Sequence, residues 1–218
     1  MTAAPRELAR DIAGATAAHA ALVAALATLT DAEVARPSLL PGWTVGHVLA
    51  HIARNADSHV RLLQAADRGE VGQQYPGGSQ QRIDDIDAGA GRPAHEHVAD
   101  IAATAQQLEA AWAATTEQGW RGEGSSAAGV VKIDDLPFRR WRETVVHHAD
   151  LGLGYTWADW PHEYVRLELQ RATMLWASRK PMGLTTLPVA AAALPDSERL
   201  AWLLGRTVVP GLEPAGIF

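Results

Sequence analysis

The sequence predicts a mainly all-α protein built on an antiparallel bundle of four long helices. Four long segments repeat apolar residues at helical spacing, and the connections between them are short, which is typical of bundled helices. Only residues 130 and 131, both valine, indicate extended chain, as either a short strand or an extended loop.

The first long helix is expected over residues 3 to 29, where the chain is rich in alanine, a strong helix former. A short helical turn begins at residue 30. Thr44 is a suitable N-cap residue for the second long helix, which we expect over residues 45 to 67. Together these segments supply the first half of the bundle.

The middle of the chain alternates loops and helices. A loop over residues 69 to 79 precedes a short helix over 80 to 88, and a third long helix follows over 94 to 117. A stretch rich in Gly and Ser over residues 119 to 132 then separates the third long helix from the fourth.

The fourth long helix is expected to begin after Asp134 or Asp135, either of which can cap it, and to run to about Leu153. The loop that follows holds three aromatic residues, which either line a pocket or cover the end of the core. A fifth helix over residues 162 to 180 and a short helix beginning near Pro195 complete the chain.

Composition narrows the class of protein. The 218 residues carry a net charge of −6 without a basic run, so we do not expect a nucleic-acid partner. We find no segment long and apolar enough to span a membrane and no signal peptide. We therefore expect a cytoplasmic protein, either a monomer or a homodimer, that acts on small molecules.

The chain has no cysteine. Disulfides, thiolate metal ligands and a protein thiol nucleophile are therefore excluded. Any thiol chemistry requires a sulfur atom that arrives on a small molecule.

Two segments predict a metal site. Glu143 and His147 stand four residues apart on the fourth long helix, so their side chains leave the same face one turn apart. His51, which apolar residues flank on the second long helix, is the best third donor. Three donors leave coordination positions open for water or substrate, which is the pattern of catalytic sites.

Several neighbouring residues allow a second interpretation. His47, His51, Asn55 and His59 form a polar stripe that is most simply explained as a solvated face, and Asn55 is also a candidate to support a ligand. His148 competes with His147 as a ligand or is a hydrogen-bonded core residue. Asp150 either orients a ligand histidine or faces solvent, and of the two we prefer solvent.

Three stretches resemble a known family, the DinB-like, mycothiol-dependent maleylpyruvate isomerases of actinobacteria. They are Leu-Leu-Pro-Gly-Trp-Thr-Val-Gly-His-Val-Leu-Ala-His over 39 to 51, Arg-Trp-Arg-Glu-Thr-Val-Val-His-His-Ala-Asp-Leu-Gly over 140 to 152, and Ala-Trp-Leu-Leu-Gly-Arg over 201 to 206. The first two match in order, in spacing and at the metal ligands.

The resemblance implies a DinB-like four-helix bundle that holds a divalent metal ion, usually zinc, on His51, Glu143 and His147, and that uses mycothiol as cosubstrate. It also implies that Arg82 and Arg206 are catalytic residues that bind substrate carboxylates. The isomerases are expected to have a longer α/β C-terminal domain. We therefore divide this chain into a metal-binding bundle over residues 1–160 and a C-terminal helix with a reduced arm over 161–218.

Three functions fit these residues. The first is a metal- and mycothiol-dependent isomerase, in which a thiolate adds to an electrophilic substrate that bears carboxylates and cis–trans isomerisation follows. The second is a mycothiol S-transferase that serves detoxification or biosynthesis. The third is a non-catalytic bundle that binds a metal ion or a small ligand.

Overall fold

The computed structural model describes residues 6–127, 129–179 and 185–216. Contacts within the chain divide it into two compact units, Met1–Gly152 and Leu153–Phe218. The two stretches predicted to supply metal ligands both lie in the first unit. Our division after residue 160 remains a prediction about the folding units.

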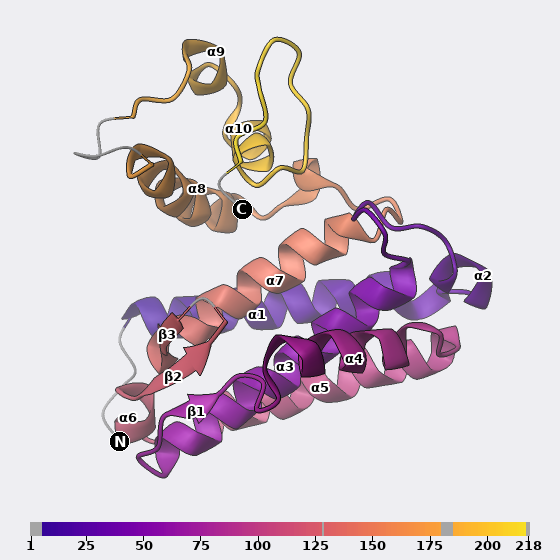
Figure 1. Ribbon diagram of the computed structural model, residues 1–218, viewed down its shortest axis with the longest axis vertical. Coiled ribbons are helices and arrows are strands. Elements are labelled where there is room, and N and C mark those ends of the chain that lie inside the picture. The colour runs from indigo at the N-terminus through magenta and orange to yellow at the C-terminus, as the bar shows by residue number, and fades with distance from the viewer. Residues whose placement is uncertain (1–5, 128, 180–184, 217–218) are drawn as a thin grey trace. The chain divides into compact units, whose positions relative to one another are not determined.

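Four long helices form the first unit (Figure 1): α1 (Arg6–Ala25), α3 (Val45–Asp67), α5 (Ala94–Ala114) and α7 (Leu136–Asp150). Helix α1 packs against α5 and α7, and α3 packs against the same two helices. Each long helix therefore has two long neighbours around a shared core. The predicted mainly all-α bundle is confirmed.

The connection through helix α4 (Gly78–Ala90) sets the relative directions of α3 and α5. The carboxylate of Asp67, at the end of α3, accepts a hydrogen bond of 2.9 Å from the Thr116 N–H just after α5, so α3 and α5 end side by side. Helix α4 carries the chain from the end of α3 back toward the start of α5. Helix α7 ends near the start of α3, where the Asp150 carbonyl accepts a hydrogen bond from the Leu39 N–H. Helices α3 and α7 are therefore antiparallel, whereas α3 and α5 are parallel.

The helices begin and end close to their predicted residues. Helix α3 has the predicted bounds, and Thr44 caps it as expected. Helix α5 ends before residue 117 because Thr116 caps a new short helix, α6 (Glu117–Trp120). The remaining differences are small. The helix expected over 3 to 29 spans Arg6–Ala25 and is followed by a 3-10 turn at Leu26–Thr28, and the helix expected over 80 to 88 spans Gly78–Ala90. The helix expected to reach 153 ends at Asp150, and the helix expected over 162 to 180 spans His162–Ala177; residues 3 to 5 and 180 lie outside the described residues.

The predicted cap position of α7 is confirmed, but the expected capping hydrogen bond is absent. Asp135 occupies the N-cap position at the end of a 3-10 turn (Ile133–Asp135), but its side chain makes no capping hydrogen bond. Its carboxylate instead accepts a hydrogen bond of 2.8 Å from Nε of Arg139, one turn later. Pro137 in the first turn, where a missing N–H costs nothing, is as expected.

A small three-stranded sheet lies beside α3. Strand β1 (Gly72–Gln73) pairs in parallel with β2 (Glu123–Ser126), and β2 pairs antiparallel with β3 (Gly129–Lys132). Residues 130 and 131 are thus in a strand rather than an extended loop. The sheet brings the loop after α3 and the Gly/Ser-rich stretch together on one side of the bundle.

Helix α1 corrects one expectation from composition. The segment Glu7–Thr28 is long and apolar enough to cross a membrane by length and composition. Its Leu8, Ala15 and Leu22 are nevertheless buried, and α1 packs on α5 and α7. Packing in the bundle therefore accounts for the apolar residues on the buried face of this helix, which is 33% of its 18-residue apolar window.

The second unit contains α8 (His162–Ala177), α9 (Val189–Ala192) and α10 (Asp196–Leu203). Helix α10 packs on α8, and the rings of Trp176 and Trp202 lie 5.2 Å apart between their centroids. Trp160, from the aromatic loop before α8, is buried beside Tyr164. This tryptophan covers a core.

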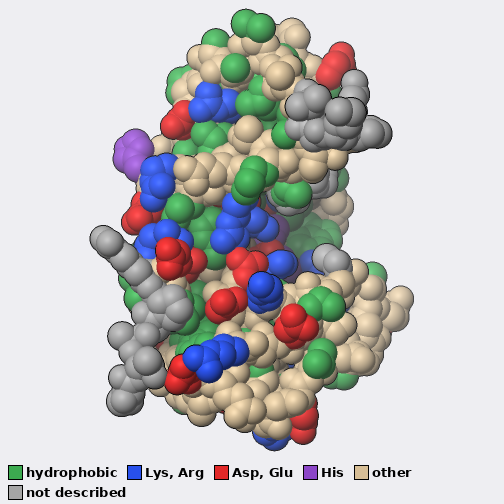
Figure 2. Space-filling model, turned by 90° about the vertical axis from the view of Figure 1, so that its left-hand side faces the viewer, with side chains coloured by type: hydrophobic (Ala, Val, Ile, Leu, Met, Phe, Trp, Pro, Cys, Tyr) green, Lys and Arg blue, Asp and Glu red, His purple; other side chains and the backbone are tan. Residues whose placement is uncertain are grey.

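Figure 2 shows one face of the molecule, on which Lys and Arg side chains are interspersed with Asp and Glu side chains. The basic side chains on this face therefore have acidic neighbours and do not gather into one basic stripe.

Candidate metal centre

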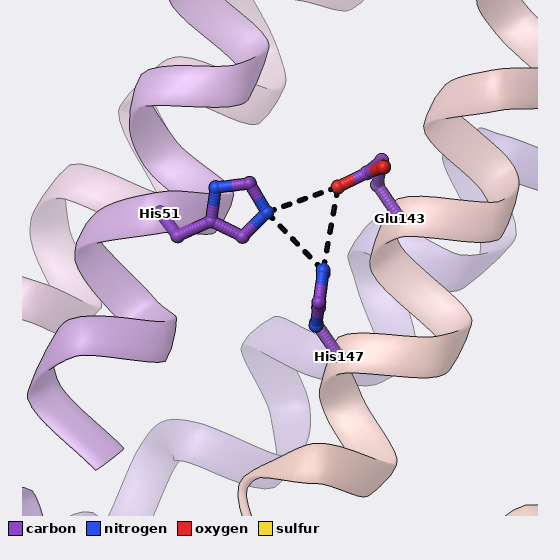
Figure 3. A group of neighbouring side chains, drawn as sticks. All are labelled: His51, Glu143 and His147. Atoms are coloured by element: carbon purple, nitrogen blue, oxygen red, sulfur yellow. Dashed lines mark hydrogen bonds and ion pairs between the residues drawn. The ribbon is translucent and has the colours of Figure 1, made fainter. Parts of the chain in front are cut away.

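Three side chains converge between α3 and α7 (Figure 3). His51 projects from α3, and Glu143 and His147 project from successive turns of α7. Nε2 of His51 lies 3.0 Å from Oε2 of Glu143 and 3.1 Å from Nε2 of His147, and the last two atoms are 3.4 Å apart. The structure thus brings together the three residues predicted to bind a metal ion.

The geometry of these atoms fits a divalent metal ion. Zinc bonds to imidazole nitrogen and carboxylate oxygen are about 2.0–2.2 Å long, so a tetrahedral ion places its ligand atoms about 3.3–3.5 Å apart. The three observed separations are within a few tenths of an ångström of that range. Two imidazoles and one carboxylate also form a donor set that zinc and other first-row metals accept. A fourth position would remain open.

Charge in the cluster is distributed unevenly. Burial lowers the pKa of His51 to about 4, so this ring is neutral at pH 7. Burial alone would raise the pKa of Glu143, but hydrogen bonds with both histidines hold it well below its usual value. Burial alone would lower the pKa of His147, but hydrogen bonds with Asp150 and Glu143 raise it to about 9. Without a metal ion, a proton on His147 balances the Glu143 carboxylate.

Asp150 faces the cluster rather than solvent, which corrects our prediction. It is 1% exposed, and its Oδ2 lies 2.8 Å from Nδ1 of His147. A histidine whose one ring nitrogen binds a carboxylate presents the other nitrogen to a metal. His148 is also buried, but it is not one of the three residues whose donor atoms converge.

The polar stripe of α3 is buried, so the solvated interpretation is wrong for most of it. His51, Asn55 and His59 are each at most 5% exposed. His47 differs from them, because it forms a capping box with Thr44 and its Nδ1 accepts a hydrogen bond from the Thr44 N–H. The rest of the stripe therefore lies inside the protein, where its members need partners.

Arg140 supplies part of that partnership, and we did not predict it. This guanidinium is 1% exposed and donates to the Ile52 carbonyl at 2.8 Å, to Oδ1 of Asn55 at 2.9 Å and to Nε2 of His19 at 2.9 Å. His19 in turn lies 2.8 Å from Glu109 through its Nδ1. One network, buried except at Glu109, therefore links all four long helices beside the cluster.

A cavity of about 370 Å³ adjoins the cluster and has Glu143 on its wall. Arg82, from α4, lines the same cavity, and one of its guanidinium nitrogens is 3.3 Å from Nδ1 of His51. Of the two arginines predicted to bind substrate, Arg82 is thus beside the predicted metal ligands.

Arg206 belongs to the second unit, just after α10. Its guanidinium donates a hydrogen bond of 2.8 Å to the Leu204 carbonyl, which helps to close the end of that helix. Its role toward a substrate stays a prediction.

Trp43 is another neighbour of the cluster that we did not single out. It lies within the Pro-Gly-Trp-Thr turn, and its ring meets that of His51 edge-on with centroids 5.7 Å apart. Trp43 immediately precedes the N-cap residue of α3 and lies about two helical turns from His51 in sequence, so its spacing could have indicated this contact.

The fold and these residues define a class: helical-bundle proteins with a two-histidine, one-carboxylate site between facing helices. The family model described as "Mycothiol maleylpyruvate isomerase N-terminal domain" matches residues 15–152, which include the whole cluster. The chain belongs to this family, as the resemblance predicted.

Two solved structures are similar to most of the chain. One is the crystal structure of the mycothiol-dependent maleylpyruvate isomerase, which is 25% identical and superposes with a TM-score of 0.80 over 92% of this chain and 90% of that one. The other is a histidine-to-alanine variant of the same isomerase, with the same identity, coverage and TM-score. No curated protein sequence matches. Because the match spans 92% of this chain and 90% of that one, our expectation of a longer isomerase C-terminal domain is wrong.

Proposed function

We propose that this protein is a metal- and mycothiol-dependent isomerase that acts on an electrophilic substrate bearing carboxylates, as its family suggests. The observation that carries the proposal is the convergence of His51, Glu143 and His147 within 3.0–3.4 Å in a member of that family. The metal, with zinc as our first expectation, and the thiol are both part of the proposal.

The chemistry agrees with the composition. A divalent metal ion held by this cluster would lower the pKa of a bound thiol and supply thiolate at neutral pH. Because the chain has no cysteine, the thiol must come from the cosubstrate. The two histidines and Glu143 would hold the ion, and the open side of the cluster would admit the thiol.

The proposed reaction is balanced without a redox partner. The thiolate sulfur adds to one carbon of a cis double bond, and the electron pair of that bond moves into a conjugated carbonyl to give an enolate. Rotation about the resulting single bond follows. When the enolate re-forms the double bond, the thiolate leaves and the trans isomer remains. Arg82, which lines the cavity beside the cluster, would bind a carboxylate and stabilise the enolate charge.

The first test is elemental analysis of wild-type protein beside His147→Ala. We expect about one zinc per chain in the wild type and loss of zinc in the variant. His95→Ala, which removes an exposed histidine on α5, is the control and should keep its zinc. Wild-type protein without metal after incubation with zinc would contradict the proposal.

The second test is turnover of maleylpyruvate with and without mycothiol. Isomerisation that requires catalytic thiol supports the proposal. Stoichiometric consumption of the thiol, with a stable thioether product, would show a mycothiol S-transferase instead. Zinc binding without either reaction would indicate a non-catalytic bundle.

A further inference from the structure

The two histidines of the cluster have opposite kinds of neighbour at Nδ1, the ring nitrogen that points away from the centre of the cluster. Nδ1 of His147 lies 2.8 Å from a carboxylate oxygen of Asp150, and an ionised carboxylate can only accept hydrogen bonds. Nδ1 of His51 lies 3.3 Å from Nη2 of Arg82, and a guanidinium can only donate them. Among the described residues, Nδ1 of His51 has no other hydrogen-bond partner. This nitrogen is therefore compatible with Arg82 only while it carries no proton.

In the metal-free protein, the proton of His51 belongs on Nε2. Burial lowers the pKa of His51 to about 4, so at pH 7 the neutral ring carries one proton on one of its two nitrogens. Nε2 lies 3.0 Å from Oε2 of Glu143, which accepts its hydrogen bond, while Nδ1 accepts one from Arg82. Both nitrogens of the ring are satisfied in this tautomer.

A metal ion at the cluster would exclude this arrangement. The ion would take the lone pair of Nε2, the nitrogen of His51 that faces Glu143 and His147, so the neutral ring would carry its proton on Nδ1. If Arg82 stayed in place, two donors would then face each other at 3.3 Å with no acceptor between them. The proton moves within a neutral ring, so this conflict does not depend on pH.

The surroundings of Arg82 allow its side chain to leave His51. Arg82 lines the cavity of about 370 Å³, and its contact with His51 is its one side-chain hydrogen bond within the described part of the chain. Arg139 lines the same cavity but donates from Nε to the Asp135 carboxylate at 2.8 Å. Arg82 therefore has both space to move into and no carboxylate that would hold it beside His51.

We propose that Arg82 changes partner when a metal ion binds: it donates to His51 in the metal-free protein and turns from His51 into the cavity when the ion takes Nε2. This inference rests on the metal centre of the proposed function. Arg82 then opposes metal binding, because the metal-free form has a hydrogen bond that the metal-bound form must give up. Asp150 has the reverse effect, since its contact with His147 suits both forms.

The test is the sign of the change in zinc affinity, measured by competition against a chelator of known affinity. Arg82→Met should bind zinc about three- to tenfold more tightly than the wild type, because it has no hydrogen bond to give up. Loss of a residue that supports a ligand histidine would instead weaken binding by about 10- to 100-fold. Arg82→Gln keeps a polar side chain on the cavity wall and should also bind zinc more tightly, should Arg82→Met not fold.

Arg139→Met is the matched control, because it removes another arginine of the same cavity whose partner is Asp135. It should change zinc affinity by less than about threefold. Two further measurements report the contact itself. Nitrogen NMR should show Nδ1 of His51 unprotonated in the metal-free wild type and protonated with zinc, and a crystal structure with zinc should place Nη2 of Arg82 more than about 3.5 Å from Nδ1.

The outcomes separate this inference from the proposed function. Equal or weaker zinc binding in the Arg82 variants, beside a wild type whose turnover requires zinc and thiol, would overturn the inference alone. Tighter zinc binding in the Arg82 variants of a protein without thiol-dependent turnover would overturn the proposed function and leave the change of partner in place. A wild type that binds no zinc would overturn both.

Discussion

Nδ1 of His147 lies 2.8 Å from Oδ2 of Asp150, one turn further along α7, and the Nε2 on the other side of the ring faces His51. The carboxylate therefore fixes both the orientation of the ring and the nitrogen that remains for a metal. Partners of this kind also make the imidazole a better donor.

We predict that Asp150→Asn lowers zinc affinity by about 10- to 100-fold, because the amide keeps the shape but not the charge of the carboxylate. Competition against a chelator of known affinity measures the change. Asp134→Asn, at an exposed position before α7, should bind zinc like the wild type. Equal affinities in Asp150→Asn and the wild type would mean that the helix alone orients His147.

Zinc binding should release one proton at neutral pH. The pKa of His147 in the metal-free protein is raised to about 9, so its ring is protonated at pH 7 and must lose that proton to bind a metal ion. His51 is already neutral, since its pKa is lowered to about 4, and Glu143 is already ionised. Zinc affinity should therefore fall about tenfold for each pH unit below about 8.

Calorimetry in two buffers of different ionisation enthalpy at pH 7 counts the protons released. Asp150→Asn provides a comparison, because the loss of its carboxylate lowers the pKa of His147 and should reduce the number released at pH 8. A binding enthalpy that does not depend on the buffer would contradict the raised pKa.

Arg140→Met should destabilise the protein by about 2–5 kcal/mol. The variant leaves the buried acceptors on Ile52, Asn55 and His19 without their donor, and unsatisfied buried polar groups are costly. Burial lowers the pKa of Arg140 to about 10, so the lost group is a charged one at pH 7. Thermal unfolding should show a midpoint lowered by about 5–15 °C.

Arg139→Met, one residue earlier and partly exposed, is the control for loss of an arginine on α7. Its midpoint should stay within about 2 °C of the wild type, because a partly exposed ion pair contributes little. Equal midpoints for the two variants would show that the buried network does not stabilise the bundle.

The helices and the three residues whose donor atoms converge could be predicted from the sequence. Periodic apolar residues placed α3 at its observed bounds, and a spacing of four residues placed Glu143 and His147 on one face. It was not sufficient for the surroundings of the site. The amphipathic pattern assigns polar faces to water, whereas Asn55 and His59 face a buried network and a cavity.

Two other differences between prediction and structure have separate physical reasons. Asp150 was assigned to solvent because charged residues near a helix end are usually exposed, although its spacing of three from His147 allows the contact that it makes. Strand β1 has two residues and forms only because β2, about fifty residues later, pairs with it. Such distant pairing leaves no local pattern in the sequence.

Substitution of Gly46 tests whether the close packing of α3 on α4 fixes the position of Arg82. A Cβ atom at Gly46 would lie 2.0 Å from the Ala90 carbonyl oxygen, so α3 approaches the end of α4 at a distance that only glycine permits. Helix propensity favours alanine over glycine by up to about 1 kcal/mol, but a clash with backbone outweighs that gain. Gly46→Ala should therefore destabilise the protein by about 1–3 kcal/mol.

The functional consequence follows from the position of α4. A shift of this helix moves Arg82 away from Nδ1 of His51, so Gly46→Ala should also raise the KM for a carboxylate substrate while zinc content stays unchanged. Gly91→Ala is the control, because a Cβ atom there meets nothing within 4 Å and the backbone φ is negative. It should leave both stability and KM near the wild type, whereas a Gly46→Ala variant with a wild-type unfolding midpoint would show that α4 yields freely and does not fix Arg82.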